Sequence, residues 1–120
     1  MNILIVEDEV VLGEILSEFL QDEGHTVRNV GNGEDALHIL SGSEGLPQVV
    51  LADIKMPRMD GRELLRRMKA SAIHIPIIFL SGQINVTDQD AITAGAAGII
   101  HKPFDFDQVV EKLNQIQLPV

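Results

Sequence analysis

Hydrophobic residues in this chain form short continuous runs that alternate with segments of helical periodicity. A strand that is buried on both faces of a parallel sheet is apolar at nearly every position, so the runs predict strands. The runs place strands at residues 3–6, 48–53, 77–80 and 97–101, and residues 26–30, closed by the turn residues 31–33, are a further predicted strand. Between them, apolar residues recur every three or four positions, which is the pattern of an amphipathic helix. The predicted helices lie near residues 11–20, 36–40, 61–68, 88–94 and 105–116.

This alternation predicts an α/β fold, in which a parallel sheet carries helices on both faces. A chain of 120 residues is long enough to bury a core, and we expect residues 1–120 to form a single domain. Gly24 follows the first helix as a C-terminal stop, and Asp60 and Glu63 have the spacing of a capping box. The helix at 88–94 contains mostly small apolar residues, so we expect it to pack lightly and to move easily.

Charged residues lie at the ends of three predicted strands. Glu7 and Asp8 follow the first strand, Asp53 ends the third, and Lys102 follows the fifth. The carboxyl ends of parallel strands meet at one edge of the sheet, where open α/β folds bind their ligands. Three carboxylates at this edge repel one another unless a cation joins them, and Mg2+ takes oxygen ligands of this kind. The sequence therefore predicts an acidic metal pocket with one lysine opposite.

Composition narrows the classes of function. The formal net charge is −9, whereas a protein that follows a nucleic-acid backbone needs a basic face, so we expect no direct nucleic-acid binding. Cysteine is absent, which excludes a disulfide framework and a thiolate zinc site. The chain does not start with a basic segment, and no apolar stretch approaches the roughly 18 residues of a membrane span. We therefore expect a cytoplasmic protein with no membrane contact.

Basic residues are concentrated in the middle of the chain. Arg28 is the only one before position 55. Most of the others follow within a short stretch: Lys55, Arg58, Arg62, Arg66, Arg67 and Lys69. Two interpretations remain open, a solvated helix face or a docking patch for an acidic partner.

Four segments of the chain resemble, in order, those of response-regulator receiver domains, the phosphoacceptor domains of two-component and phosphorelay signalling. Residues 3–9 are similar to the acidic opening of that family, and residues 51–61 to its phosphoacceptor segment. Residues 78–82 match its hydroxyl position, and residues 94–104 match its lysine segment. The resemblance covers the whole chain and implies a flavodoxin-like sheet with the strand order 2-1-3-4-5.

The resemblance also implies roles for individual residues. Asp53 would accept a phosphoryl group from a histidine kinase or a histidine phosphotransfer protein, as a nucleophile that forms an acyl phosphate. Lys102 would pair with Asp53 or its phosphate as a compact point charge, and Ser81 would donate a hydrogen bond to the phosphate. The peptide bond between Lys102 and Pro103 is expected to be cis.

For the metal, the resemblance implies Mg2+ bound directly by Asp8, Asp53 and the backbone carbonyl of Lys55. Glu7 would contact the ion through water. Glutamate replaces the commoner aspartate at this position, and its longer arm still reaches a bound water. Mg2+ would neutralise charge on the phosphoryl group during transfer.

Two residues depart from the usual pattern of the family or modify it. Ile99 stands where many receiver domains carry a Tyr or Phe ring that swings inward on activation. Without a ring, we expect a modest rearrangement on phosphorylation, concentrated in residues 81–87 and the start of the next helix. Lys55 places a second cation two positions after Asp53, and we hypothesise that it slows hydrolysis of the acyl phosphate.

The resemblance further implies partners. The kinase helices would dock on the exposed side of the first helix, around Gly13, Glu14, Ser17 and Glu18, with the loop 103–105. The switch would act on an unknown partner or effector through the helix at 88–94, the strand through Ile99 and the last helix, with a dimer on phosphorylation left open. The chain is either a stand-alone regulator or part of a longer protein.

Two other classes of protein compete with this interpretation. An aspartate-nucleophile phosphohydrolase also uses Mg2+, but it typically carries a second aspartate two residues after the first, where this chain has Lys55. We therefore expect no enzyme activity beyond self-phosphorylation and slow autodephosphorylation. A degenerate receiver that serves only as an interaction module is disfavoured, because every acidic, hydroxyl and lysine position is filled.

Overall fold

Each continuous apolar run is a strand of one parallel sheet in the computed structural model, which describes residues 1–83 and 86–116. The strands are β1 (Asn2–Val6), β2 (Thr26–Val30), β3 (Val49–Asp53), β4 (Ile77–Ser81) and β5 (Gly98–His101). Their order is β2-β1-β3-β4-β5, which confirms the predicted topology. Every residue of β3 and β4 is buried, as expected for central strands that are covered on both faces.

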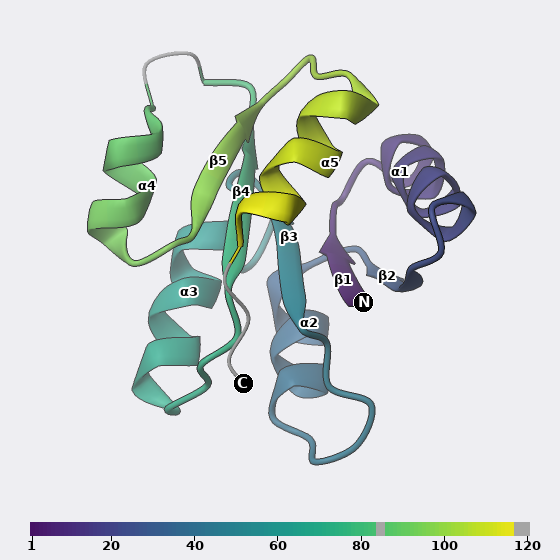
Figure 1. Cartoon of the computed structure of the whole chain (residues 1–120). Helices are drawn as coiled ribbons and strands as arrows, with labels where there is room; N and C mark the ends of the chain where they lie inside the picture. The colour runs from purple at the N-terminus through teal and green to yellow at the C-terminus, as the bar shows by residue number, and fades with distance from the viewer. Residues whose placement is uncertain (84–85, 117–120) are drawn as a thin grey trace.

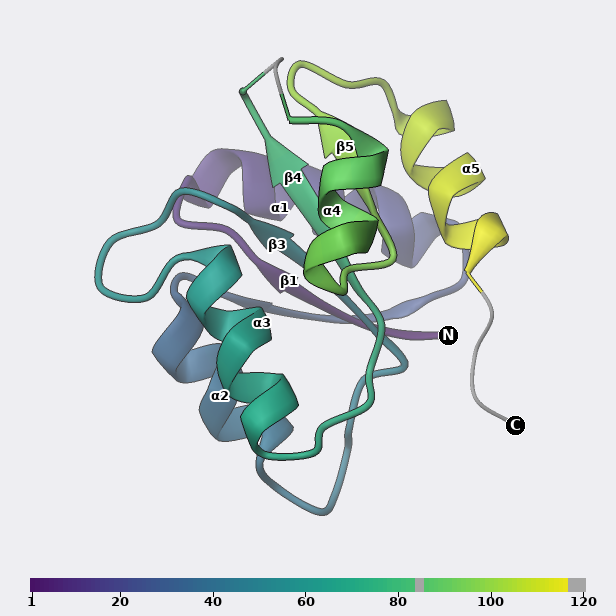
Figure 2. The same cartoon turned by 90° about the vertical axis from the view of Figure 1, so that its left-hand side faces the viewer.

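Helices cover both faces of this sheet (Figure 1). The described residues contain α1 (Val10–Asp22), α2 (Gly33–Leu40), α3 (Gly61–Ala70), α4 (Asp88–Ala94) and α5 (Phe106–Gln115). Figure 2 shows α2, α3 and α4 together on one face of the sheet. Residues of these helices, such as Leu64, share one core cluster, and residues of α1 and α5, such as Leu16 and Val109, share another. The predicted α/β fold with two helical layers is confirmed.

The capping signals explain where most helices begin and end. Gly24 follows the C-cap residue Glu23 of α1 and takes a φ of 94°, which is the left-handed conformation of a C-terminal stop. Thr87 and Asp90 form both halves of a capping box at α4. The side chain of Asn32 accepts a hydrogen bond from the Asp35 amide, so α2 begins at Gly33, earlier than its apolar periodicity indicates.

The capping box predicted for α3 forms only in part. Asp60 accepts a hydrogen bond from the backbone amide of Glu63, as expected of an N-cap residue. The carboxylate of Glu63 does not return to Asp60, because it pairs with Arg66 and Arg67 on the next turn of the helix. The guanidinium groups, as charged donors, compete for this carboxylate more strongly than a neutral amide does.

Two further sequence expectations concern the loops and the helix lengths. The Lys102–Pro103 peptide bond is cis, as expected. The segment 81–87, in which we expect a rearrangement, includes residues 84 and 85, which lie outside the described residues. None of the helices in the described part of the chain combines the length and the apolar character that a membrane crossing requires.

Candidate functional site

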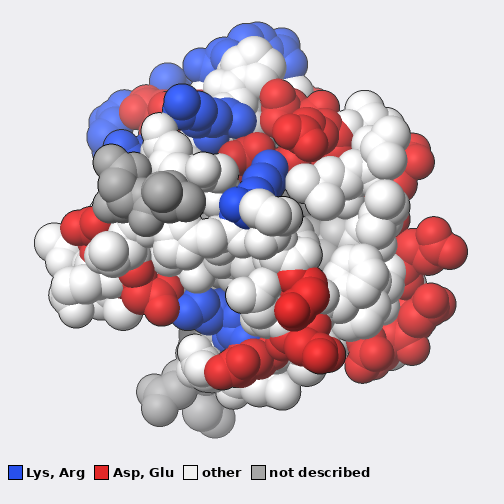
Figure 3. All heavy atoms as spheres, turned by 90° about the horizontal axis from the view of Figure 1, so that it is seen from above, with Lys and Arg blue, Asp and Glu red and all other residues white. Residues whose placement is uncertain are grey.

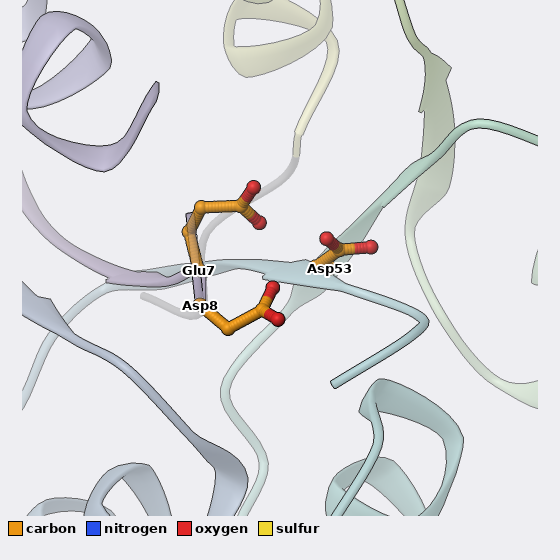
Figure 4. A group of neighbouring side chains, drawn as sticks. All are labelled: Glu7, Asp8 and Asp53. Atoms are coloured by element: carbon orange, nitrogen blue, oxygen red, sulfur yellow. The ribbon is translucent and has the colours of Figure 1, made fainter. Parts of the chain in front are cut away.

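Three acidic side chains converge at the carboxyl edge of the sheet. β1 and β3 are neighbours, and Val6 lies beside Ala52 in their register, so the residues that follow these two positions emerge side by side. Figure 4 shows Glu7 and Asp8 at the end of β1, with their carboxylates directed toward Asp53 at the end of β3. A carboxylate oxygen from each residue lies within 4.8 Å of the others. The parallel register thus brings together acids that are far apart in sequence.

Lys102 enters this cluster from the loop after β5. Its Nζ donates hydrogen bonds to Glu7 Oε1 and to Asp53 Oδ2, each at 2.8 Å. The side chain of Glu7 is fully buried, and those of Asp53 and Lys102 are only 9% and 17% exposed. The backbone amide of Lys102 also donates to the carbonyl oxygen of Ser81, which fixes the loop against the end of β4. The ammonium group is therefore held between two carboxylates at a defined position.

Burial and pairing shift the protonation equilibria of this cluster. Burial raises the pKa of the Glu7 carboxyl to about 7, because the hydrogen bond from Lys102 only partly offsets the loss of water and the neighbouring Asp53 adds repulsion. For Lys102, burial favours the neutral amine, but hydrogen bonds to Asp53 and Glu7 outweigh it and raise the pKa of the ammonium group. The lysine thus stays charged, while Glu7 ionises only with difficulty.

The cluster has the composition of a site for a hard cation. Three carboxylates and one ammonium group leave two negative charges when all are ionised, which a divalent ion would balance. Glu7 Oε2 is buried and has no hydrogen-bond partner among the described residues. A buried carboxylate oxygen without a partner is costly, so this atom needs a proton, a water molecule or an ion. These residues could hold a metal ion.

A cavity of about 360 Å3 opens beside the cluster, and it is lined by residues that include Asp53, Lys55, Ser81 and Lys102. Ser81 is buried, and its Oγ accepts a hydrogen bond from the Gln83 amide at 2.9 Å. The described residues provide no acceptor for the hydroxyl proton of Ser81, so it can be donated to a ligand in the cavity. The backbone amide of Lys55 donates to Asp53 Oδ1 at 3.2 Å, and its side chain lies at the exposed rim.

Some residues of the site escaped the sequence analysis. Glu9 and Gln83 line the same cavity, although nothing in their local pattern separates them from ordinary loop residues. Gly61 has a positioning role, because a Cβ atom there would lie 2.5 Å from the carbonyl oxygen of Asp53. Its amide donates to the carbonyl of Ile54, which closes the loop against the end of β3. Gly61 closes the segment 51–61 that resembles the phosphoacceptor segment, but its packing against the carbonyl of Asp53 depends on the tertiary structure.

An apolar surface lies next to the site, between α1 and the start of α5. Ile15 and Phe106 are 47% and 38% exposed, and the rings of Phe19 and Phe106 stack with their centroids 4.2 Å apart. A second cavity of about 420 Å3 lies on this side, lined by Glu9, Leu12, Ile15, Lys102, Pro103, Phe104 and Phe106. Large exposed apolar groups around one cavity are typical of a binding surface.

One residue that the sequence analysis assigned to this exposed surface was placed wrongly. Gly13 is buried, because α1 packs against β2 at this point and a Cβ atom would lie 2.8 Å from the side-chain nitrogen of Asn29. Glu14 and Glu18 are exposed, as expected, and Ser17 is half-buried. The absence of a side chain at position 13 therefore serves helix packing rather than docking.

Figure 3 looks down on the carboxyl edge of the sheet, where many of the basic side chains gather on one side and several acidic side chains lie beside them. The basic residues identified from the sequence, from Lys55 to Lys69, are all exposed. Several of them are partly neutralised: Arg58 pairs with Glu34, and Arg66 and Arg67 pair with Glu63. These pairs favour the interpretation of this stretch as a solvated face.

Comparisons with known proteins agree on one family. The family model described as "Response regulator receiver domain" matches residues 3–114. The chain is 34% identical over 116 residues to the transcriptional regulatory protein DltR of Streptococcus agalactiae, covering 95% of this chain and 50% of that protein. It is 30% identical over 117 residues to the virulence transcriptional regulatory protein PhoP of Shigella flexneri, covering 97% and 52%. The chain thus spans about half the length of these curated relatives.

A solved structure extends the similarity to three dimensions. The response regulator protein TrrA of Thermotoga maritima, determined in complex with Mg2+-BeF, has a TM-score of 0.81 and 32% identity. The match covers 95% of this chain and 96% of that one. The likeness therefore includes the whole sheet and both helical layers.

Proposed function

Because this chain belongs to the response regulator receiver domain family of two-component systems, we propose that it accepts a phosphoryl group on Asp53. The observation that carries the proposal is the placement of Lys102, whose ammonium group contacts Asp53 Oδ2 at the mouth of an open cavity. An Asp53 oxygen would attack phosphorus, and the bond from phosphorus to the donor group would break. The product would be an acyl phosphate on Asp53. We regard residues 1–120 as one receiver domain, which the single sheet supports.

We assign the surrounding residues by what their atoms offer to that acyl phosphate. Lys102 supplies a positive charge that is already desolvated and directed at Asp53, so the site needs little reorganisation during phosphoryl transfer. Ser81 lies on the cavity wall, and its hydroxyl can donate to a phosphoryl oxygen while its Oγ accepts from the Gln83 amide. The amide of Lys55 already donates to Asp53 Oδ1 and holds the carboxylate in one orientation.

We further propose that the metal is Mg2+, held by Asp8, Asp53 and the backbone carbonyl of Lys55, with Glu7 acting through water. The residual negative charge of the cluster and the unpartnered Glu7 Oε2 support this choice. When bound, Mg2+ would neutralise negative charge on the incoming phosphoryl group. The structure of the similar protein TrrA was determined in complex with Mg2+-BeF, which supports the choice of Mg2+.

The phosphoryl donor would be a histidine kinase or a histidine phosphotransfer protein that docks beside the site. The exposed Ile15 and Phe106, which line the cavity between α1 and the start of α5, offer an apolar surface for its helices, and Val10 and Val11 add exposed apolar side chains at the start of α1. Exposed carboxylates at Glu14 and Glu18 would set the orientation of the partner. The output would go to an effector through α4, β5 and α5, with a dimer on phosphorylation left open. We propose a cytoplasmic location, which the absence of cysteine fits.

We do not propose turnover of an external substrate. A phosphohydrolase of the aspartate-nucleophile class would need a general acid close to Asp53, and the residue two positions on is the base Lys55. The expected reactions are therefore phosphorylation of Asp53 and its slow hydrolysis.

Acetyl phosphate provides a direct test without a kinase. With Mg2+, the protein should gain one phosphoryl group by mass spectrometry, and trapping with borohydride should locate it on Asp53. Asp53→Asn and removal of the metal by a chelator should each abolish the gain. Asp22→Asn, at an exposed acid at the end of α1, is the matched control and should behave as wild type. A phosphate on Ser81 or Thr87, or one that persists in Asp53→Asn, would refute the assignment.

A further inference from the structure

Asp88 and Lys112 form an ion pair at the edge strand β5, away from the phosphoacceptor site. Asp88 is the first residue of α4, and Lys112 lies on α5, so the two residues come from helices that flank the edge strand β5 from opposite faces (Figures 1 and 2). Lys112 Nζ contacts Asp88 Oδ1 at 2.9 Å and Oδ2 at 2.8 Å. These two side chains thus join the two helical layers at β5.

The same carboxylate also holds the strand between the two helices. Ile99 donates its backbone amide to Asp88 Oδ1 at 2.9 Å. β5 has a strand neighbour on one side only, so an amide on its other side needs a different acceptor, and Asp88 supplies it. Partial burial opposes the charge on Asp88, but Lys112 and the Ile99 amide outweigh it and lower the pKa of the carboxyl. The carboxylate is thereby kept ionised and doubly bound.

Gly98 leaves room for this arrangement. A Cβ atom at position 98 would lie 3.1 Å from Lys112 Cε and 3.2 Å from Asp88 Oδ1. Both distances are shorter than ordinary van der Waals contacts, so a side chain at position 98 would displace Lys112 or Asp88. The glycine therefore allows the pair to lie directly against the backbone of β5.

The segment that carries Asp88 begins at the phosphoacceptor site. Ser81 lies on the cavity wall, and Asp88 follows seven positions later. Between them, the carbonyl of Val86 accepts a hydrogen bond from His101 Nε2, and His101 is paired with Ser81 in the register of β4 and β5. A displacement of Ser81 toward a phosphoryl group would therefore reach the start of α4 through His101 and the carbonyl of Val86, two residues before Asp88.

We propose that Asp88, Ile99 and Lys112 form a clasp that stabilises the resting arrangement of α4 and opens when Asp53 is phosphorylated. The proposal rests on the function proposed above and names how the site is coupled to α5. Ile99 takes part in the clasp through its backbone amide, so the contact depends on the position of β5 and not on the side chain. A contact that forms in the resting state but not in the active state shifts the equilibrium toward the resting state.

Thermodynamic linkage makes the clasp measurable. If it exists only in the resting state, removing Lys112 raises the population of the active state and therefore the affinity for a ligand that selects that state. Lys112→Met should bind beryllofluoride, a phosphoryl mimic, about fivefold more tightly than wild type in Mg2+, at the low end of allosteric couplings. Arg67→Met removes a cation from an exposed ion pair within α3 and should bind as wild type does.

Titrations of wild type, Lys112→Met and Arg67→Met decide between the alternatives, with circular dichroism to verify that each variant is folded. Equal affinity of wild type and Lys112→Met would mean that the contact persists in both states, and weaker binding by the variant would place the contact in the active state. Either result would overturn the clasp. No beryllofluoride binding by wild type would instead refute the proposed function, and the clasp with it.

Hydrogen exchange gives a second measurement on the unmodified protein. The Ile99 amide should be protected in the resting state and should exchange faster in Mg2+ and beryllofluoride, because its acceptor Asp88 moves away. Unchanged or slower exchange at Ile99, with beryllofluoride bound, would also overturn the proposal.

Discussion

Replacing Glu7 by glutamine should stabilise the metal-free protein at neutral pH, although it changes a hydrogen-bonding partner of Lys102. Glu7 is buried, and its pKa rises from 4.5 to about 7 in the folded protein. Because the folded state holds the proton more tightly than the unfolded state, the free energy of unfolding should fall as the pH rises from 4.5 through 7. Glutamine resembles the protonated carboxyl in shape and cannot ionise, so the variant lacks this loss.

The size of the effect follows from the shift itself. A difference of about 2.5 pKa units corresponds to ~3 kcal/mol, at roughly 1.4 kcal/mol for each unit. This is an upper bound, since relaxation of the cluster and entry of water would reduce it. Near pH 4.5 the two proteins should be almost equally stable, and above pH 7 Glu7→Gln should be more stable by one to three kcal/mol, an order-of-magnitude expectation.

Urea unfolding followed by far-ultraviolet circular dichroism is the suitable assay, because the chain contains neither Trp nor Tyr. The difference in the free energy of unfolding between variant and wild type at each pH cancels the contributions of other titrating groups. One such group is His25, whose pKa is lowered by burial and by the nearby amino terminus. Measurements in a chelator isolate the protonation effect, and millimolar Mg2+ should shrink the difference by stabilising the wild type. A difference that does not change between pH 4.5 and 8, or a wild type that is the more stable protein at pH 8 without metal, would refute the reasoning.

Two further predictions concern transfer to Asp53 and the lifetime of the product. Reversing the charges of the exposed Glu14 and Glu18 to lysine should slow phosphotransfer from the cognate kinase but leave labelling by acetyl phosphate intact; equal loss of both reactions would indicate damage to the fold or the site. Lys55→Ala should shorten the lifetime of the acyl phosphate about fivefold, the effect of removing a charge worth ~1 kcal/mol, as measured by loss of radiolabel; an unchanged or longer lifetime would contradict a protective role for this lysine.

The sequence determined the strands and the position of the acidic edge. A parallel strand that is buried on both faces must be apolar nearly throughout, so the apolar runs identified β1, β3, β4 and β5. The charges at the ends of β1, β3 and β5 marked the carboxyl edge. The convergence of Glu7, Asp8 and Asp53 then follows from the order of β1 and β3 in the sheet. Helix caps such as Asp60 could also be predicted from the sequence, because the residues that form a cap lie within one helical turn of each other.

Tertiary structure decided everything that depends on contacts between distant segments. The packing of loops at the carboxyl edge buries Glu7 and thereby shifts its pKa. The same packing places Lys102 between Glu7 and Asp53. The burial of Gly13 depends on the approach of α1 to Asn29. Asp88 and Lys112 meet because α4 and α5 flank the same edge strand, which no local pattern specifies. Periodicity reports which face of an element is buried, whereas a contact between side chains is fixed only when the elements have packed together.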